Sequence, residues 1–256
     1  MAKQPIIAAQ LYTLRDYVKT EEEFFKTLEK VKEIGYDCVQ ISAVGPYRAD
    51  ALKDKLDALG MSVCVTHDPL DKILERTDEI IAHHKLLGIK YAGLGYYVFN
   101  NMEDCKSFVE KIVPVAKKFR DNGIKFVYHN HAHEFVKFDN GVRPMDYILE
   151  NTSPDEVGIL ADMFWLQSAG VSPTKFIADN AERLNVVHFK DMKYTLERTQ
   201  NMAAIFDGNM DYDSIYDACL KAGVEYIAVE QDMCYGRCPF DELKLSRENI
   251  KKRLGV

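Results

Sequence analysis

The sequence predicts an α/β protein with a (β/α)8 TIM-barrel fold, built as one domain over residues 1–256. Its length of 256 residues is the usual size of one such barrel. Eight short apolar, β-branched runs alternate with longer amphipathic stretches from one end of the chain to the other. This alternation implies a parallel sheet with a helix after each strand. We expect strands at Ile6–Tyr12, Cys38–Ser42, Ser62–His67, Lys90–Gly95, Lys125–His131, Val157–Asp162, Asn185–Lys190 and Tyr226–Gln231.

The stretches between these runs have helical periodicity and recognisable helix ends. Phe24, Leu28 and Val31 fall on one helical face. Pro114 is expected to bend the helix that contains it. The connection Asp232–Leu245 looks longer than the others and is expected to reach over the open end of the barrel. Glycines placed to end helices in a left-handed conformation are Gly35, Gly60, Gly88, Gly123 and Gly223. Polar residues placed to begin helices are Thr20, Asn101, Asp211 and Ser246.

Composition excludes several classes of protein. The net charge of −7 argues against a surface that follows a nucleic-acid backbone. No stretch is long and apolar enough to cross a membrane, and the segment Met1–Pro5 has no secretory signal pattern. The six cysteines are scattered and mostly lie in apolar runs, and the pair Cys234 and Cys238 lacks the second pair of a zinc site. We therefore expect a cytoplasmic protein with reduced cysteines.

Four consecutive strands end in residue types that bind metals. These are His129 or His131, then Asp162, His188 and Glu230. Each residue alone has a structural explanation, since an aspartate caps helices and a buried histidine is often a hydrogen-bonded core residue. Their occurrence at four successive strand ends, where TIM barrels place their chemistry, favours a metal site. Nitrogen and carboxylate ligands together suit Mn²⁺, Co²⁺, Zn²⁺, Fe²⁺ or Mg²⁺.

The same strand ends supply candidates for catalysis. Glu230 is the expected base, with His129 or His131 as its acid–base partner, and Lys190 is placed to neutralise an oxyanion or to bind a substrate hydroxyl. Because side chains alternate along a strand, His129 and His131 point to the same side, and the sequence leaves open which of them binds the metal. The expected substrate-binding residues are Gln10, His67, His131, Glu134 and Arg237.

At these residues the sequence resembles the xylose isomerase-like TIM-barrel superfamily over nearly its whole length. That group includes sugar phosphate isomerases and epimerases, inosose dehydratases and the endonuclease IV proteins. The Glu-Gln-Asp sequence at the end of the last strand is similar to the inosose dehydratase branch. The resemblance is carried by the segments Ala9–Asp16, Tyr128–Phe135, Val187–Asp191 and Val229–Asp232.

The resemblance implies a metal held by Glu, Asp, His and Glu from strands five to eight. Carried over by position, these fall on His129, Asp162, His188 and Glu230. His129 stands where many relatives have Glu, and Trp165 stands where many have His. Epimerases of this superfamily place two metal-bound carboxylates on opposite faces of the reacting carbon. Only Glu230 of that pair is present here, which argues against symmetrical two-carboxylate epimerisation.

Together these features predict a divalent-metal-dependent isomerase or epimerase that acts on a small-molecule sugar or sugar phosphate through an enediolate. A keto-sugar or inosose dehydratase would use the same site and differ only in the second step. An endonuclease IV-like repair enzyme is disfavoured by the acidic charge. A non-catalytic sugar-binding barrel is disfavoured by the intact set of strand-end residues. Whether the substrate is phosphorylated, which metal binds and whether the chain forms a homo-oligomer through its outer helices are left open.

Overall fold

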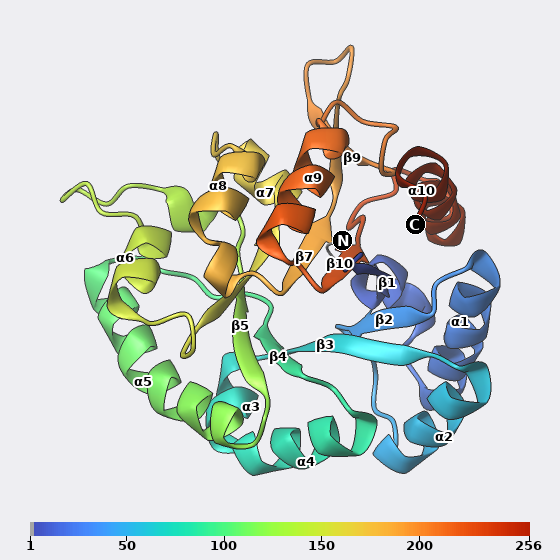
Figure 1. The fold of residues 1–256 in the computed structure, drawn as a ribbon, viewed down its shortest axis with the longest axis horizontal. Coiled ribbons are helices and arrows are strands. Elements are labelled where there is room, and N and C mark those ends of the chain that lie inside the picture. Colours follow the sequence, from blue (N-terminus) through green and yellow to red (C-terminus); the bar gives the residue numbers. More distant parts are fainter. Residues whose placement is uncertain (1–2) are drawn as a thin grey trace.

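The computed structural model describes residues 3–256 and contains a closed barrel of eight parallel strands (Figure 1). The predicted single-domain (β/α)8 TIM barrel is therefore confirmed. Met1 and Ala2 lie outside the described residues. They begin the N-terminal segment that is expected to lack a secretory signal. Around the barrel the strand order is β1-β10-β7-β6-β5-β4-β3-β2. The barrel strands are β1 (Ile6–Gln10), β2 (Cys38–Ile41), β3 (Ser62–Asp68), β4 (Tyr91–Leu94), β5 (Lys125–His129), β6 (Gly158–Asp162), β7 (Val186–Phe189) and β10 (Tyr226–Val229).

Helices surround the strands (Figure 1). Thr20 begins the first of them with a capping box that it forms with Glu23, and Gly35 ends it in the left-handed conformation. Among the described residues, no helix has both the length and the apolar character needed to span a bilayer. The α-helices are α1 (Glu21–Ile34), α2 (Ala49–Leu59), α3 (Leu70–Glu75), α4 (Thr77–Leu87), α5 (Met102–Asp121), α6 (Pro144–Asn151), α7 (Met163–Ser168), α8 (Pro173–Asp179), α9 (Tyr212–Ala222) and α10 (Pro239–Leu254). Short 3₁₀ helices are η1 (Leu11–Tyr17), η2 (His133–Phe135) and η3 (Ala181–Arg183).

The expected start of the last helix at Ser246 is wrong. Helix α10 begins at Pro239, whose fixed φ angle suits the first helical position. Ser246 lies inside the helix, where its buried hydroxyl accepts a hydrogen bond from the backbone N–H of Ile205. The connection after β10 is therefore shorter than predicted. A longer connection follows β7 and runs to the cap of α9 at Asp211.

The barrel interior is built in layers because side chains alternate along each strand. One layer is apolar and receives at least one residue from every barrel strand. A second layer, which is mostly polar, lies two residues further along each strand on the same face. The apolar layer comprises Ala8, Cys38, Val65, Tyr91, Val127, Leu160, Val186 and Ala228. The layer above it comprises Gln10, Gln40, His67, Gly93, His129, Asp162, His188 and Glu230.

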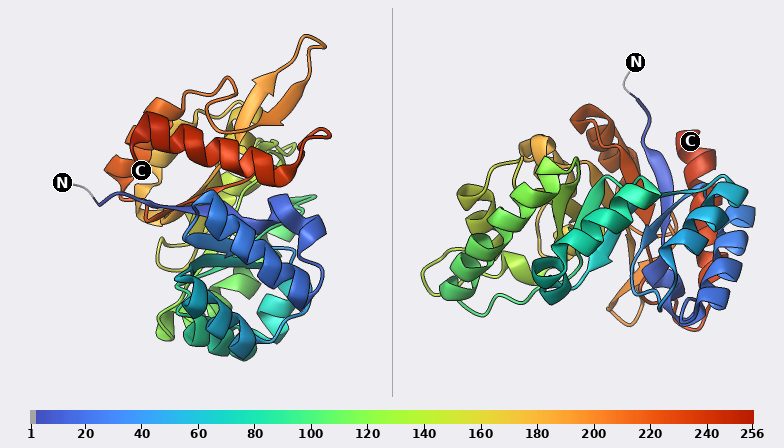
Figure 2. Two further views of the ribbon diagram at one scale, coloured as in Figure 1. Left: turned by 90° about the vertical axis from the view of Figure 1, so that its right-hand side faces the viewer. Right: turned by 90° about the horizontal axis from the view of Figure 1, so that it is seen from below.

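The connection after β7 contains an antiparallel hairpin that the sequence did not predict. Its strands, β8 (Asp191–Tyr194) and β9 (Gln200–Ala203), form a separate two-stranded sheet. The hairpin projects from the body of the molecule (Figure 2). At its base the buried Asp191 carboxylate accepts hydrogen bonds from four backbone N–H groups, at 2.7–3.3 Å. This single side chain therefore fixes the loop that follows the hairpin.

We expect Asp191→Ala to lower the free energy of unfolding by about 2–4 kcal/mol, because it leaves several partly buried N–H groups without an acceptor. The measurement is urea unfolding followed by circular dichroism. Lys193→Ala, on the exposed part of the same hairpin, is the control and should change stability by less than about 0.5 kcal/mol. Equal stability of the two variants would contradict this role for Asp191.

Two adjacent histidines in α4 form hydrogen bonds within the fold. The His84 ring is buried, with Nδ1 2.8 Å from the carbonyl of Ile80 and Nε2 3.1 Å from the Thr66 hydroxyl. His83 Nε2 lies 3.0 Å from the Tyr47 hydroxyl. Burial, reinforced by the neighbouring His84, lowers the pKa of His83 from 6.5 to about 4.

A histidine whose pKa is lower in the folded chain than in the unfolded chain destabilises the fold as it becomes protonated. We therefore expect the free energy of unfolding to fall as the pH decreases from about 6.5 through about 4. His83→Gln keeps a hydrogen-bonding group for Tyr47 but cannot titrate, so its stability should change less over this pH range. Parallel pH curves for the two proteins would rule out His83 as a contributor.

Candidate metal and active site

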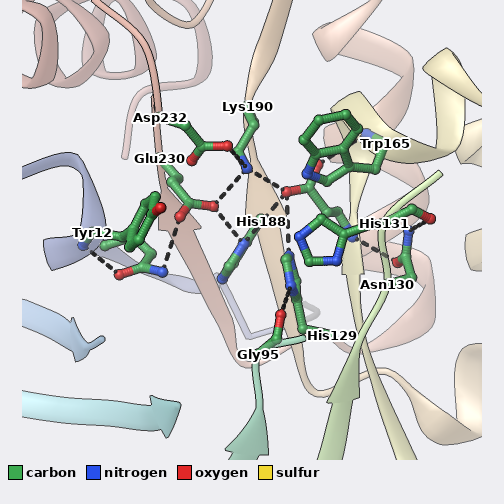
Figure 3. Close-up of polar contacts among 12 residues, drawn as sticks. Tyr12, Gly95, His129, Asn130, His131, Trp165, His188, Lys190, Glu230 and Asp232 are labelled. Carbon is green, nitrogen blue, oxygen red and sulfur yellow. Dashed lines mark hydrogen bonds and ion pairs between the residues drawn. The ribbon is translucent and has the colours of Figure 1, made fainter. Parts of the chain in front are cut away.

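Four predicted metal ligands converge at the C-terminal ends of neighbouring strands (Figure 3). His129, Asp162, His188 and Glu230 lie on β5, β6, β7 and the residue after β10, and all four are buried. Each offers one ligand atom, and these atoms lie within 4.8 Å of one another. The Asp162 Oδ2 atom is 3.4 Å from His129 Nε2 and 3.5 Å from His188 Nδ1. A single ion can therefore lie within reach of all four side chains.

The hydrogen bonds of the two histidines indicate which ring nitrogens are free to bind a cation. His188 Nε2 lies 2.7 Å from Gln40 Oε1, and His129 Nδ1 lies 3.0 Å from the Gly95 carbonyl. Both acceptors are carbonyl oxygens, so these nitrogens carry the protons. The other nitrogen of each ring then faces carboxylates, with His188 Nδ1 only 2.9 Å from Glu230 Oε2 and His129 Nε2 3.4 Å from Asp162 Oδ2. Metal-binding histidines are commonly oriented in this way by a hydrogen bond from the second nitrogen.

Among residues 3–256, His188 Nδ1 is buried without a hydrogen-bond partner. It lies 2.9 Å from Glu230 Oε2, and that oxygen also contacts the ammonium of Lys190. Buried polar groups are normally satisfied, so a nitrogen left free beside two carboxylates is suited to bind a cation. The donor set of two imidazoles and two carboxylates fits a divalent ion of the Zn²⁺, Mn²⁺, Co²⁺ or Fe²⁺ type. His129 belongs to this cluster, whereas His131 does not.

Lys190 adds a permanent charge beside the cluster (Figure 3). Its Nζ lies 3.0 Å from Asp162 Oδ2, 2.9 Å from Glu230 Oε2 and 3.0 Å from Asp232 Oδ2. Burial disfavours the charged ammonium, but the three carboxylates outweigh burial and raise the pKa of Lys190. Burial likewise opposes ionisation of Asp162 and Glu230, and Lys190 holds the pKa of each well below its usual value. Both carboxylates are therefore ionised at neutral pH.

A cavity of about 450 Å³ opens above the cluster. Six of the predicted site residues line it, and two of these make informative contacts. Gln10 Nε2 donates to Glu230 Oε1 at 3.0 Å, and His67 Nε2 lies 2.9 Å from Gln40 Nε2. The residues that line the cavity are Gln10, Tyr12, Ser42, Ala43, His67, Asp68, Pro69, Gly95, Tyr96, His129, His131, Lys190, Glu230 and Asp232.

Two predicted substrate-binding residues do not line this cavity. Glu134 is fully buried, with one oxygen accepting from the Tyr128 hydroxyl and the other from the backbone N–H of His131. Arg237 instead pairs with Glu242 at 3.0 Å. Neither side chain contributes to the lining of the space above the cluster.

Sequence reasoning did not select several residues that the structure brings to the site. Gln40 orients His188, and Asp232 contacts Lys190. Burial and the nearby charge of Glu230 raise the pKa of Asp232 to about 7. Applying the two-residue period to every strand would have identified Gln40 as well as the four ligands. No comparable sequence pattern identifies Tyr12 and Tyr96, which lie at the rim of the cavity.

The comparisons with known proteins agree with this architecture. Residues 28–251 match the family model described as xylose isomerase-like TIM barrel. The chain therefore belongs to the xylose isomerase-like TIM-barrel family. An inosose dehydratase of Clostridium beijerinckii is 23% identical, with 92% of this chain and 91% of the relative covered.

Solved structures share the fold at low identity. A sugar phosphate isomerase/epimerase from Parabacteroides distasonis superposes with a TM-score of 0.82 at 21% identity, covering 97% of this chain and 98% of that one. The IolI protein, solved with a zinc atom, superposes with a TM-score of 0.72 at 15% identity, covering 96% and 97%.

We expect the purified chain to bind one divalent ion, and His129→Gln and His188→Gln each to weaken binding by about 10–100-fold or more. The measurement is equilibrium dialysis with Zn²⁺ and Mn²⁺ followed by elemental analysis. His131→Gln is the matched control, since His131 lies two residues from His129 but outside the four-residue cluster. If His131→Gln lost the ion and His129→Gln kept it, the assignment of the ligand on β5 would be wrong.

Proposed function

We propose that this protein is a metal-dependent enzyme that removes a proton next to the carbonyl group of a sugar or sugar-like ketone, with Glu230 as the base. The observation that carries the proposal is the position of Glu230. Its carboxylate lies on the cavity and contacts both the buried His188 and the ammonium of Lys190. A base, a fixed cation and a set of metal ligands thus face the same space.

The proposed ligands of the ion are His129, Asp162, His188 and Glu230. A divalent ion held there would supply Lewis-acid polarisation of a carbonyl oxygen. The zinc atom in the IolI protein, which shares this fold, supports the choice of a divalent ion.

Side chains of the protein itself orient the base, stabilise the developing charge and bind a substrate hydroxyl. Gln10 fixes one oxygen of Glu230, which leaves the carboxylate oriented toward substrate. The Lys190 ammonium, already held by buried carboxylates, offsets the negative charge that develops on the substrate oxygen as the proton leaves carbon. Because that cation is fixed before the reaction, little reorganisation is required in the transition state. Asp232 Oδ1 is buried without a partner in the described part of the chain, so it is placed to accept a hydrogen bond from a substrate hydroxyl.

The carboxylates that are available as bases lie on one side of the cavity. This favours isomerisation by a single base over epimerisation, which uses two bases on opposite faces of the substrate. Asp162, Glu230 and Asp232 come from the β6 and β10 side of the cavity. On the facing wall, the Asp68 carboxylate is held by Lys72 and by the Thr66 hydroxyl. A single base can return the proton to the neighbouring carbon on the same face, which converts a ketose to an aldose or the reverse.

Dehydration is the second candidate, and a separate observation favours it. The C. beijerinckii relative, aligned over nearly its whole length, is an inosose dehydratase. After the same proton abstraction, a hydroxyl on the next carbon leaves as water, with its proton supplied by an acid such as Asp232. A DNA-repair function has no comparable support, since the net charge is −7 and the cavity is lined by a single lysine within residues 3–256.

The test is incubation of the metal-loaded protein with ketoses, 3-keto sugars and inososes in heavy water, followed by mass spectrometry. Deuterium gained without loss of water would support isomerisation, whereas loss of water would support dehydration. No change in any of these compounds would count against proton abstraction as the function.

Glu230→Gln should reduce deuterium exchange by about 10²–10⁴-fold under metal saturation, because the amide cannot take up the proton. Glu225→Gln is the matched control. Glu225 precedes β10 at the opposite end of the barrel, where it accepts a hydrogen bond from the Tyr91 hydroxyl. Its variant should exchange at the wild-type rate. Retention of full exchange by metal-loaded Glu230→Gln would show that another group is the base.

A further inference from the structure

The cavity offers no free cation to a phosphorylated substrate. Within residues 3–256, Lys190 is the only lysine or arginine that lines it, and three carboxylates already surround its ammonium. A divalent ion held below would be balanced by the charges of Asp162 and Glu230. A phosphate dianion at the outer end of a bound substrate would therefore lack a partner.

Two cations that contact residues of the cavity wall are already paired. Lys72 pairs with Asp68. Arg15 donates to the backbone carbonyls of Tyr12 and Asp232, at 3.0 and 2.9 Å, and its guanidinium stacks 4.6 Å from the centre of the Tyr12 ring. Neither side chain lines the cavity.

TIM barrels that bind phosphorylated substrates frequently use backbone N–H groups in the loops after strands seven and eight. Here the loop after β7 does present converging N–H groups, but the Asp191 carboxylate already binds them. Gly208 packs so closely on this carboxylate that even a methyl side chain would overlap it. These N–H groups are therefore not available to a phosphate.

The groups that remain available suit hydroxyls. Asp232 Oδ1 and His131 Nδ1 are buried and have no hydrogen-bond partner in the described chain, and both residues line the cavity. At the rim, the side chains of Tyr12 and Tyr96 are 36% and 59% exposed. Aromatic rings of this kind pack against the apolar face of a ring compound while its hydroxyls remain hydrogen-bonded.

We infer that the substrate is an uncharged, polyhydroxylated keto compound, bound between Tyr12 and Tyr96, and that the carboxylates of Asp68 and Asp232 reject its phosphorylated counterpart. The inference rests on the proposed function, because it names the class of compound that the same site takes. According to this inference, sugar phosphates are not substrates of this protein, although membership of the family alone would permit them.

The test compares matched pairs of keto compounds on the metal-loaded protein: d-fructose and its 6-phosphate, d-tagatose and its 6-phosphate, and d-xylulose and its 5-phosphate. Binding is followed by NMR of the tyrosine and histidine rings, so turnover is not required. We expect the neutral member of at least one pair to bind about tenfold more tightly than its phosphate ester or better. Equal or tighter binding of the esters would overturn the inference. So would the absence of any perturbation by the neutral compounds at high concentration.

Asp68→Asn tests the cause of the discrimination. It removes a negative charge from the cavity wall and frees the ammonium of Lys72, so the phosphate esters should bind several-fold more tightly. Asp71→Asn makes the same change in charge at an exposed position of α3 and should leave the preference unchanged. Equal effects of the two variants would point to net charge in place of a specific contact.

The inferred substrate class and the proposed reaction can be disproved independently of each other. Preferential binding of a neutral compound without deuterium exchange would support the substrate class and count against the proposed reaction. Deuterium exchange into a phosphate ester, with none into its neutral partner, would support the reaction and overturn the substrate class.

Discussion

The buried charges around Lys190 are the interaction on which the rest of the site depends. An ammonium and two ionised carboxylates at the bottom of a cavity are costly to bury separately, and removing one member of such a group typically costs about 3–5 kcal/mol. Here the charges come from β6, β7 and the end of β10, so the group also ties three neighbouring strand ends together. The arrangement that stabilises the open end of the barrel is the one that orients the proposed base.

The alternation of side chains places this group at a defined depth. Below it every barrel strand contributes an apolar residue, and above it the same faces carry Tyr12, His131 and Asp232. The inward faces thus change from apolar to polar over one step of two residues along each strand. The apolar layer closes the barrel to water from below, which strengthens the electrostatic interactions between Lys190 and its carboxylates.

This regularity explains how much the sequence could predict. Strand positions and the set His129, Asp162, His188 and Glu230 follow from local periodicity, and the structure brings those four side chains together. The hairpin of β8 and β9 was missed because Asp191 organises it through backbone N–H groups, which leave no pattern in the residue types. Choosing between His129 and His131 required the Gly95 carbonyl, which is distant in sequence.

The inward positions at the end of β4 and just after it are the glycines Gly93 and Gly95, and this absence of side chains decides where a neighbouring residue lies. The His67 ring occupies the space in front of Gly93 and Gly95, so that a methyl group at either position would collide with it. The end of β4 thus contributes a backbone carbonyl and open space to the site, and the His67 ring from β3 occupies that space. In any relative, the identities of the residues aligned with these two glycines indicate whether the histidine of β3 can turn toward the metal ligands. Two residues without side chains therefore indicate the shape of the cavity.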